Sequence, residues 1–398
     1  MGGLFHCSAQ ISTLIAATGA DSADATRNGT HSVGRGAGKY WPKTFSLRTC
    51  FICLINHDLG YPCVNSSMTS DDAPPPVPTL PPPRLPPPSL SQSRLYADVL
   101  QSMGRDVRTL TLGSIGLARL ILRSAGPFGK IGLIPGGVQW ADTSSQAARA
   151  DALRALPALT RNHGVRVLLC NSVSAMDENI FEKNFHLPVL SAGFHAELDL
   201  TQSSEIRRKN LHGKWRNRLK KSENSDITIT HSRFSPHAHN WLLTAEQTQR
   251  RARSYRALPL NFLLIAAQIA PDSVRVFVAS IHGKPLAGII FLIHDKAATY
   301  HIATTTDQGR AHSVHALLLW QATDWLAKGG VTRLDLGPVE TEHPPGHARF
   351  KLGTGARPVQ RGATVLYARS IAPLGWLNAT FNRKAAHAAA MQSDLSCH

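Results

Sequence analysis

The sequence predicts a mixed α/β fold, and the observations that predict it lie in its C-terminal half. Three short apolar runs, 274–281, 286–293 and 298–305, are joined by tight connections, which indicates an antiparallel meander. In 313–330 the apolar residues recur at spacings of three and four, as on one face of an α-helix, until two glycines end the pattern. A buried strand, VTRLDLG (331–337), follows, and we expect it to lie parallel in the sheet.

The chain before the meander predicts a second block of mixed strands and helices. The expected elements are a helix over 91–104, strands over 107–113, 118–125 and 130–140, a helix over 144–164 that Pro157 kinks or splits, and strands over 165–171 and 194–201. Within them, the glycines of IPGGVQW (134–140) are expected to form a turn. Helices over 244–258 and 261–270 lead into the meander, and 355–370 is expected to close the sheet as a hairpin.

Residues 1–92 differ from the rest because they lack sustained periodicity. They end in the run 71–91, where Pro dominates, and such a run favours polyproline II over a packed core. We expect a disordered leader that acts as a spacer. One alternative is a docking site for a proline-binding partner, and another is that translation starts downstream, for instance at Met68.

The cysteine pattern and the N-terminal sequence indicate the cellular compartment in which the protein is expected. Cys50 and Cys53 form a C-x-x-C pair with His57 and Cys63 nearby, but no second pair follows, so we expect no metal. Six Cys in 398 residues are not a disulfide framework. The chain lacks a basic n-region and any apolar run of about 20 residues. We therefore expect a cytoplasmic protein without a membrane span.

The chain carries a net charge of +17, and nearly all of the excess lies in 93–398. Residues 1–92 hold 6 Lys/Arg and 5 Asp/Glu, so the folded part is the basic part. A basic globular body indicates an anionic partner, such as a nucleotide cofactor, a nucleic acid or a membrane surface. The alternative is a protein that is basic without a dedicated partner.

The strongest basic signal is in 203–223. As a helix, Leu211, Trp215 and Leu219 would share one buried side, while the basic residues face outward or line a groove. These are Arg207, Arg208, Lys209, Lys214, Arg216, Arg218, Lys220 and Lys221.

Two motifs carry a resemblance to a known family. One is LHGKWRNRLKK (211–221), and the other is LDLG (334–337) followed by GHARFKLGTGA (346–356). With these motifs the sequence resembles the FemAB-like branch of the GNAT acyltransferase superfamily, which includes the Fem peptidyltransferases. The resemblance covers 93–370.

The resemblance implies two tandem GNAT-like domains. The first, 93–200, would be degenerate and shape the cleft. The second, 201–371, would be the acyltransferase domain, and 372–398 would form a tail.

The resemblance also implies how the donor and acceptor bind. Lys214, Trp215, Asn217 and Arg218 would shape the cleft and meet anionic groups on donor or acceptor. A solvated basic face and nucleic-acid binding are rival uses of the same charges.

An acyl-CoA, with acetyl-CoA first, would be the co-substrate, and no cofactor would be tightly bound. Its pantetheine arm would pair with 286–293, and its pyrophosphate would meet the helix N-terminus at Gly309, Arg310 and Ser313. The usual acetyl-CoA signature of the family, Gln or Arg, two residues, Gly, any residue and then Gly or Ala, is missing from TTDQGRAHS (305–313). An aminoacyl-tRNA is the alternative donor, less favoured because the long helical arm of some Fem enzymes is not seen.

Candidate catalytic groups are Tyr300, His301, Asp335 and Lys351, with Glu340 as a further acid. His301 has the chemistry of a general base, and Asp335 sits in LDLG at a strand end, where capping a loop is the alternative role.

Arg349, Phe350 and Lys351 match the family's Phe-Lys motif. The resemblance implies that Arg349 and Phe350 contact substrate and that Lys351 meets the oxyanion or a phosphate. The prediction is an N-acyltransferase whose amine acceptor is a small molecule or a cell-envelope precursor. A tRNA partner is not favoured. The alternative is a non-catalytic protein of the same fold that binds RNA or another polyanion.

Overall fold

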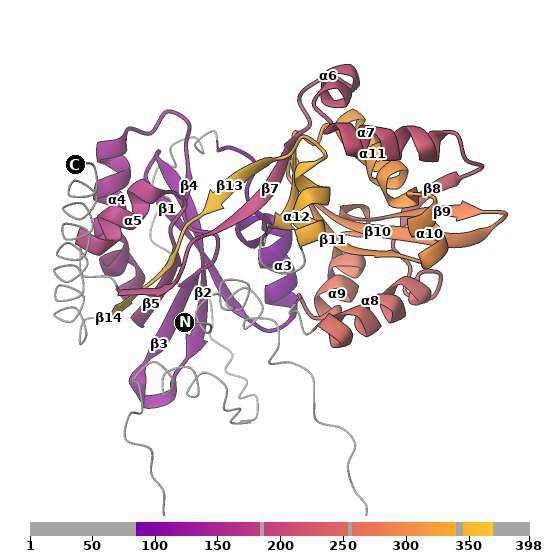
Figure 1. Cartoon of the computed structure of the whole chain (residues 1–398). Helices are drawn as coiled ribbons and strands as arrows, with labels where there is room; N and C mark the ends of the chain where they lie inside the picture. Colours follow the sequence, from indigo (N-terminus) through magenta and orange to yellow (C-terminus); the bar gives the residue numbers. More distant parts are fainter. Residues whose placement is uncertain (1–84, 184–186, 254–256, 340–344, 369–398) are drawn as a thin grey trace, which may run out of the picture.

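The computed structural model of the chain describes residues 85–183, 187–253, 257–339 and 345–368. The expected leader up to residue 84, its cysteines, Glu340 and the tail from 372 lie outside these residues. Within them the fold is mixed α/β and holds two sheets of seven strands, which confirms the predicted fold class. Figure 1 shows two blocks side by side, with strands β7 and β13 running between them.

The first sheet has the order β1-β2-β3-β5-β14-β6, with β4 paired to β2. Only β3 and β5 pair in parallel. Its strands are β1 (Asp106–Leu112), β2 (Gly116–Ser124), β3 (Lys130–Ile134), β4 (Gln139–Trp140), β5 (Val165–Asn171), β6 (Leu187–Leu190) and β14 (Thr364–Ala368).

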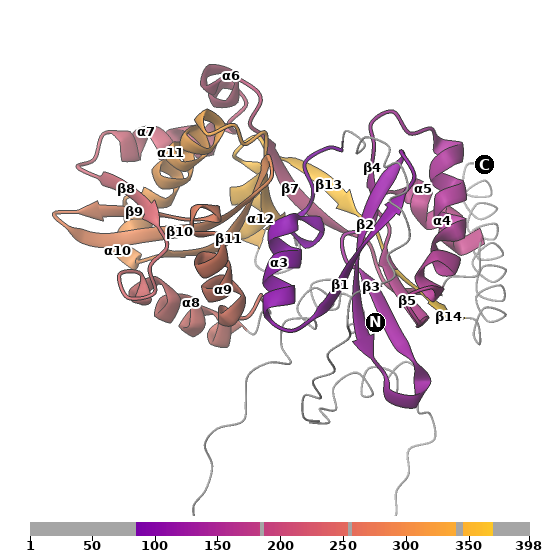
Figure 2. The same cartoon turned by 180° about the vertical axis from the view of Figure 1, so that it is seen from behind.

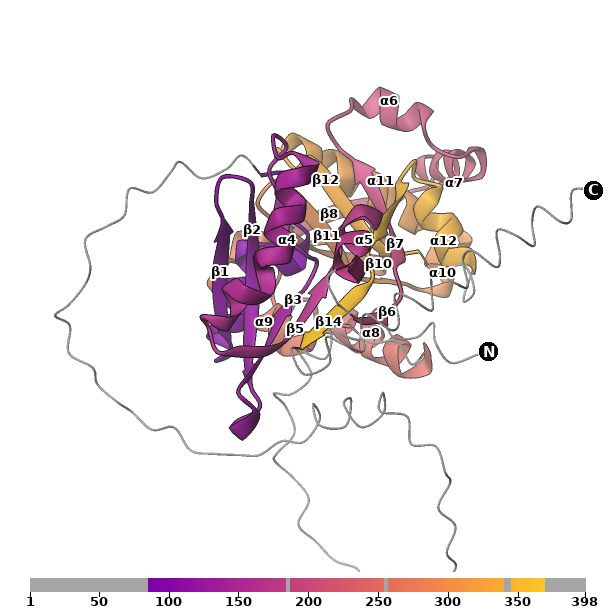
Figure 3. The same cartoon turned by 90° about the vertical axis from the view of Figure 1, so that its left-hand side faces the viewer.

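Helices α4 (Gln146–Arg161) and α5 (Ala175–Lys183) lie over the outer face of this sheet (Figure 3). Ser145 starts α4 by accepting the amide of Ala148. Of the two expected effects of Pro157, a kink or a split, the split does not occur, because the helix continues through this residue. Leu153 and Leu156 are buried against the strands, and this packing offsets the hydrogen bond that the proline cannot make.

The second sheet has the order β13-β7-β12-β11-β10-β9-β8. The predicted meander is its centre, and β11 and β12 pair in parallel as expected. The strands are β7 (Gly193–Asp199), β8 (Thr228–Arg233), β9 (Val274–Ile281), β10 (Lys284–His294), β11 (Ala297–Thr305), β12 (Arg333–Pro338) and β13 (Arg357–Arg361).

One face of the second sheet is covered by helices. Two of them are formed by the basic segment, and the others follow the meander in the chain. The basic segment 203–223 forms two helices instead of one, and the break between them is held by the amide of His212, which donates to the carbonyl of Gly353 (3.0 Å). The helices are α6 (Ser204–Lys209), α7 (Gly213–Glu223), α10 (Asp307–Ala311), α11 (Val314–Lys328) and α12 (Pro345–Leu352).

The other face of the second sheet packs toward the first block. Figure 2 shows α3 (Arg94–Ser102) lying between the two blocks. It shares one apolar cluster with α8 (Asn240–Arg253), α9 (Leu260–Ile269) and both sheets. Short 3-10 turns cover Leu90–Gln92, Gly126–Phe128 and Pro271–Ser273.

The expected hairpin over 355–370 is wrong, because its two strands join different sheets. Strand β13 pairs with β7 in the second sheet, and β14 pairs with β5 and β6 in the first. Gly362 lies at the crossing, where a side chain would come within 2.5 Å of the Ser172 carbonyl. Only glycine allows the two segments to approach this closely.

The end of the proline-rich run belongs to the fold. Arg333 donates to the carbonyls of Pro87 (2.9 Å) and Pro88 (2.5 Å), and Gln139 donates to that of Pro86 (3.2 Å). This segment therefore contacts both sheets, through β4 and through β12.

Among the described residues, no helix is long and apolar enough to cross a membrane.

Candidate active site

The second sheet opens where its parallel pair ends. Strands β11 and β12 are paired from Ala297 with Arg333 to Thr299 with Asp335. On its other edge β12 pairs with β7 from Arg333 opposite Asp199 to Pro338 opposite His195. Strand β11 continues beyond the parallel pair to Thr305. The edge of β11 after Thr299 is thus not paired with β12, and its backbone groups are open to another partner.

Four aromatic rings line the helical side of this opening. They form a continuous series in which Trp215 contacts Phe350 (5.9 Å between ring centroids), Phe350 contacts His315 (5.4 Å) and His315 contacts Tyr300 (6.1 Å). The rings come from α7, α12, α11 and β11. The structure therefore brings three predicted site residues, Trp215, Phe350 and Tyr300, to one place and adds His315.

His315 connects two hydroxyl groups across this opening. Its Nε2 lies 2.8 Å from Tyr300 Oη, and its Nδ1 lies 3.0 Å from Thr305 Oγ1. Burial lowers the pKa of His315 to about 4, so the ring is neutral near pH 7 and has one donor and one acceptor nitrogen. Because a hydroxyl can take either role, protons can be exchanged along the Tyr300–His315–Thr305 line.

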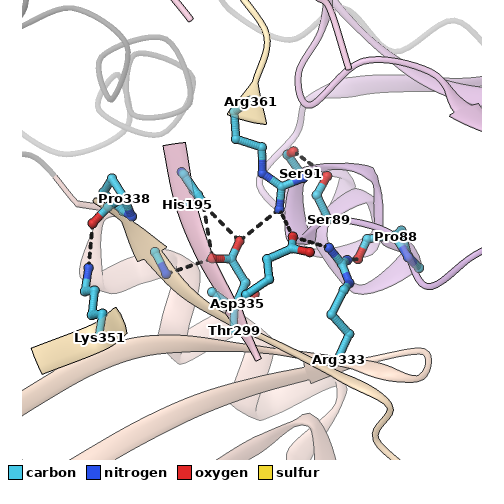
Figure 4. A network of polar contacts seen from close by, with 12 residues as sticks. Pro88, Ser89, Ser91, His195, Thr299, Arg333, Asp335, Pro338, Lys351 and Arg361 are labelled. Carbon is cyan, nitrogen blue, oxygen red and sulfur yellow. Dashed lines mark hydrogen bonds and ion pairs between the residues drawn. The ribbon is translucent and has the colours of Figure 1, made fainter. Parts of the chain in front are cut away.

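A network of charged side chains lies on the opposite face, where β7, β12 and β13 run side by side (Figure 4). Asp335 accepts hydrogen bonds from His195 Nδ1, 3.0 Å from both carboxylate oxygens, and from Arg361 (3.3 Å). Glu197 accepts from Arg333 (2.6 Å) and from Arg361. The network thus joins two carboxylates, two guanidinium groups and one imidazole, and each side chain is at least partly shielded from solvent.

Asp335 is ionised in this setting. Its burial opposes the charge, but His195, Arg361 and the backbone amide of Gly337 (2.7 Å) stabilise the carboxylate more strongly. Together they hold the pKa of Asp335 well below its ordinary value.

Lys351 lies at the same end of β12. Its Nζ donates to the carbonyl of Pro338 (2.8 Å) and lies beside Gly337, which has a left-handed backbone (φ 83°). The ammonium group is thus held next to the turn whose amide binds Asp335. The predicted residues Asp335 and Lys351 thus both contact this turn, Asp335 through the amide of Gly337 and Lys351 through the carbonyl of Pro338 (Figure 4).

His301 lies away from both groups. It lines a small cavity with Arg250 and Glu246 of α8, and burial together with the Arg250 charge lowers its pKa to about 4. Arg349 is exposed on α12, one residue before the aromatic ring of Phe350. The structure therefore separates His301 from the remaining catalytic candidates.

The predicted cofactor residues lie at the junction of α10 and α11. Gly309 is buried, and a side chain there would come within 2.7 Å of the Leu286 carbonyl. Arg310 donates to Asp307 within α10 and to the carbonyl of Thr305 at the end of β11. Ser313 is left-handed (φ 55°) and precedes α11 without a side-chain cap.

Two side chains of α7, which belongs to the basic segment, form hydrogen bonds with this junction. Lys221 donates to the carbonyl of Ala311 (2.9 Å), and Ser222 donates to those of His312 and Ser313 (2.8 Å each). The expected burial of Leu211, Trp215 and Leu219 is confirmed, although Leu211 precedes α7 and only the other two lie on it.

The basic residues of the segment divide into two groups. Arg207 is buried against Asp324 (2.6 Å), and Arg208 pairs with Glu223. Lys214, Asn217 and Arg218 are exposed on the outer side of α7. Their side chains contact none of the described residues through polar groups.

The strand 286–293 cannot take the pantetheine arm as expected. This segment lies within β10, which pairs with β9 on one side and with β11 on the other over most of its length. The open edge near the site belongs to β11.

Sequence reasoning missed His195, Glu197, Arg333, Arg361 and His315. The alternation of β7 and β12 does contain a signal, because His195 and Glu197, and likewise Arg333 and Asp335, lie two residues apart and so share a face of their strands. What the sequence lacks is the information that β7 and β12 are neighbours.

The comparisons agree with this geometry. Residues 207–352 match the family described as the acetyltransferase (GNAT) domain. This part of the chain is therefore similar to GNAT domains. The matched residues include α7, the opening beside β11, and Lys351. No curated protein matches the chain in sequence.

Solved structures extend the match in fold beyond the GNAT domain. The structure of FemX is similar over 74% of this chain and 96% of its own, with a TM-score of 0.60 and 10% identity. This chain therefore shares the fold of FemX, and the likeness supports the predicted resemblance to the FemAB-like branch. Also similar is the C-terminal domain of a putative lysylphosphatidylglycerol synthetase from Agrobacterium fabrum, over 73% of this chain and 93% of its own, with a TM-score of 0.47 and 16% identity.

Proposed function

We propose that this protein is an N-acyltransferase that moves an acyl group from a thioester to an amine. The observation that carries the proposal is the opening between β11 and β12, which ends at Asp335 and Lys351. Such an opening offers one unpaired strand edge and, at its end, a fixed cation.

The donor would lie along the edge of β11. The pantetheine arm of an acyl-CoA carries two amide groups, and an unpaired strand edge binds extended amides by main-chain hydrogen bonds. The phosphates would then fall near the start of α11, where Arg310 and Lys221 supply positive charge and the helix has free amides. Acetyl-CoA is therefore the donor to test first, with an aminoacyl-tRNA as the alternative.

Lys351 would stabilise the transition state. Acyl transfer places negative charge on the carbonyl oxygen, and a fixed donor close to that oxygen lowers the barrier. The ammonium group of Lys351 is held at the end of β12 by the carbonyl of Pro338 (2.8 Å), and a charge placed there would stabilise the oxyanion. The amine of a small molecule or of a cell-envelope precursor would be the acceptor.

A melting experiment tests the donor. The full chain would be heated with increasing acetyl-CoA, at low and at moderate salt, and with heparin as a polyanion control. A saturable rise of the melting temperature that survives salt supports a thioester site. A rise that heparin reproduces and salt removes contradicts it.

That second outcome would favour a protein that binds RNA or another polyanion. The exposed side chains of Lys214, Arg218 and Lys220 favour this second function, because they lie on one helix and contact none of the described acidic groups. Contacts of exposed cations with phosphates weaken steeply with salt. Reversing the charge of Lys214 and Arg218 would then abolish the heparin effect.

A further inference from the structure

The charged network contains a histidine and a carboxylate in the arrangement of a general base. His195 places Nδ1 3.0 Å from both oxygens of Asp335. A carboxylate in this position accepts the Nδ1 proton, so the lone pair of the neutral ring is on Nε2. The pair joins β7 to β12 and is therefore set by two strands of one sheet.

Asp335 has few ways to move. Its oxygens also accept the Gly337 amide (2.7 Å) and the guanidinium of Arg361 (3.3 Å), and its side chain is 12% exposed. Arg361 in turn is shared with Glu197, which binds Arg333. The carboxylate is thus ionised and fixed, and it determines the orientation of the imidazole.

The side chain of His195 is more exposed to solvent than that of Asp335. Its side chain is 31% exposed, and none of the described residues forms a hydrogen bond with its Nε2. Asp335 therefore occupies Nδ1 of the ring, while Nε2 has no hydrogen-bond partner among the described residues. A purely structural histidine would be expected to use both nitrogens or to bury the unused one.

The position of His195 matches the site proposed above. It lies opposite Pro338 in the pairing of β7 with β12, and the carbonyl of Pro338 holds Lys351. A proton acceptor and a cation therefore flank the same strand end (Figure 4).

We propose that His195 is the general base of the acyl transfer and that Asp335 positions it. This inference rests on the proposed function. The amine nitrogen attacks the acyl carbon, and a C–N bond forms as the bond from carbon to the thioester sulfur breaks. His195 Nε2 takes the proton that the amine nitrogen loses, and the departing thiolate is protonated by solvent or by the imidazolium. Lys351 neutralises the carbonyl oxygen in between.

Carbethoxylation with diethyl pyrocarbonate tests the dyad without a known acceptor. The reagent acylates an accessible imidazole nitrogen that has a free lone pair. In the full chain, peptide mapping should find His195 labelled at least as fast as His282, which lies exposed in the turn between β9 and β10. His282 serves as the internal control.

Asp335→Asn provides the decisive variant. Its remaining oxygen is expected to stay with the Gly337 amide, which turns the new NH₂ group toward His195 and favours the proton on Nε2. Labelling of His195 should then slow several-fold, and labelling of His282 should not change. An unlabelled His195, or a rate that Asp335→Asn leaves unchanged, overturns the proposal.

A second variant serves if Asp335→Asn does not fold. In His195→Asn the amide can still donate to Asp335, but the base is lost. Acetyl transfer to a primary alkylamine, which is mostly protonated at neutral pH, should fall far more than transfer to hydroxylamine, which is uncharged there. Equal losses with both acceptors overturn the assignment.

Labelling depends on the dyad alone and not on the donor. A protein that labels at His195 in the Asp335-dependent way, but is not stabilised by acetyl-CoA, contradicts the thioester donor and leaves the dyad standing. Failure of the proposed thioester donor can therefore be distinguished from failure of the proposed His195–Asp335 dyad.

Discussion

At the residue scale, the site combines two charged groups that the fold holds in different ways. Asp335 accepts hydrogen bonds from His195, Arg361 and the amide of Gly337, whereas the ammonium group of Lys351 donates to the carbonyl of Pro338. This arrangement suits their proposed roles, because a fixed carboxylate can orient an imidazole and a positioned cation can stabilise an oxyanion.

Lys351→Met should remove the oxyanion donor while keeping the apolar part of the side chain. We expect turnover to fall by about 10²–10³-fold, the typical cost of losing one such donor, with acetyl-CoA binding largely kept. Release of the CoA thiol from acetyl-CoA measures turnover. Lys328→Met is the matched control, since Lys328 is 81% exposed at the end of α11, and unchanged turnover in Lys351→Met would exclude the role.

Three buried histidines should make stability depend on pH. Burial lowers the pKa of His294 to about 3 and those of His301 and His315 to about 4. Between these values and about 6.5 the unfolded chain binds more protons than the folded one, so the free energy of unfolding rises with pH. It should therefore fall as the pH drops from about 6.5 toward 4.

Urea unfolding at pH 7 and pH 5 measures this effect. His315→Gln should make the difference between the two pH values smaller, whereas the exposed control His282→Asn should leave it as in the parent. A parent protein equally stable at both pH values would be inconsistent with neutral, buried histidines.

At the element scale, local patterns predicted the centre of the second sheet well. Strand β9 begins and ends at the predicted residues, and β10, β11 and α11 differ from the prediction by one or two residues at an end. These elements follow from the spacing of apolar residues within each segment. Strands β6 and β8 were not predicted, because β8 is mostly exposed at a sheet edge and β6 is short and contains Pro188.

Gly309→Ala tests the junction of α10 with β10. The added methyl group would meet the Leu286 carbonyl at 2.7 Å and Thr305 Cγ2 at 2.9 Å. We expect a loss of about 1–3 kcal/mol in the free energy of unfolding, the usual cost of overpacking, and weaker binding of acetyl-CoA.

Gly213→Ala is the control, since nothing lies within 4 Å of a side chain at that position on α7. Urea unfolding compares the two variants. Equal stability would show that α10 moves freely against β10.

At the scale of the whole molecule, the two blocks exchange strands. Strand β7 precedes the predicted boundary at residue 200 but lies in the second sheet, and β14 follows the second block but lies in the first. The proline-rich end at 86–88 adds a contact to each side. No local pattern reveals these exchanges, because which sheet a strand joins depends on residues far away in the chain.

The exchange predicts one cooperative unfolding transition for both blocks. When Trp41, Trp140 and Trp376 are all replaced by Phe, the remaining tryptophans are Trp215, Trp241, Trp320 and Trp325. All four follow residue 200, so their fluorescence reports the second block. Far-UV circular dichroism reports both. The two urea curves should coincide, and separate midpoints would mean that the blocks fold independently.

The central claim is that this GNAT domain transfers acyl groups from a thioester to an amine. The most direct test is release of the CoA thiol from acetyl-CoA by the full chain in a mixture of primary amines, with mass spectrometry of the products. The account predicts amine-dependent thiol release together with an acetylated amine, both lost in Lys351→Met. Saturable acetyl-CoA binding without any amine-dependent release would contradict it.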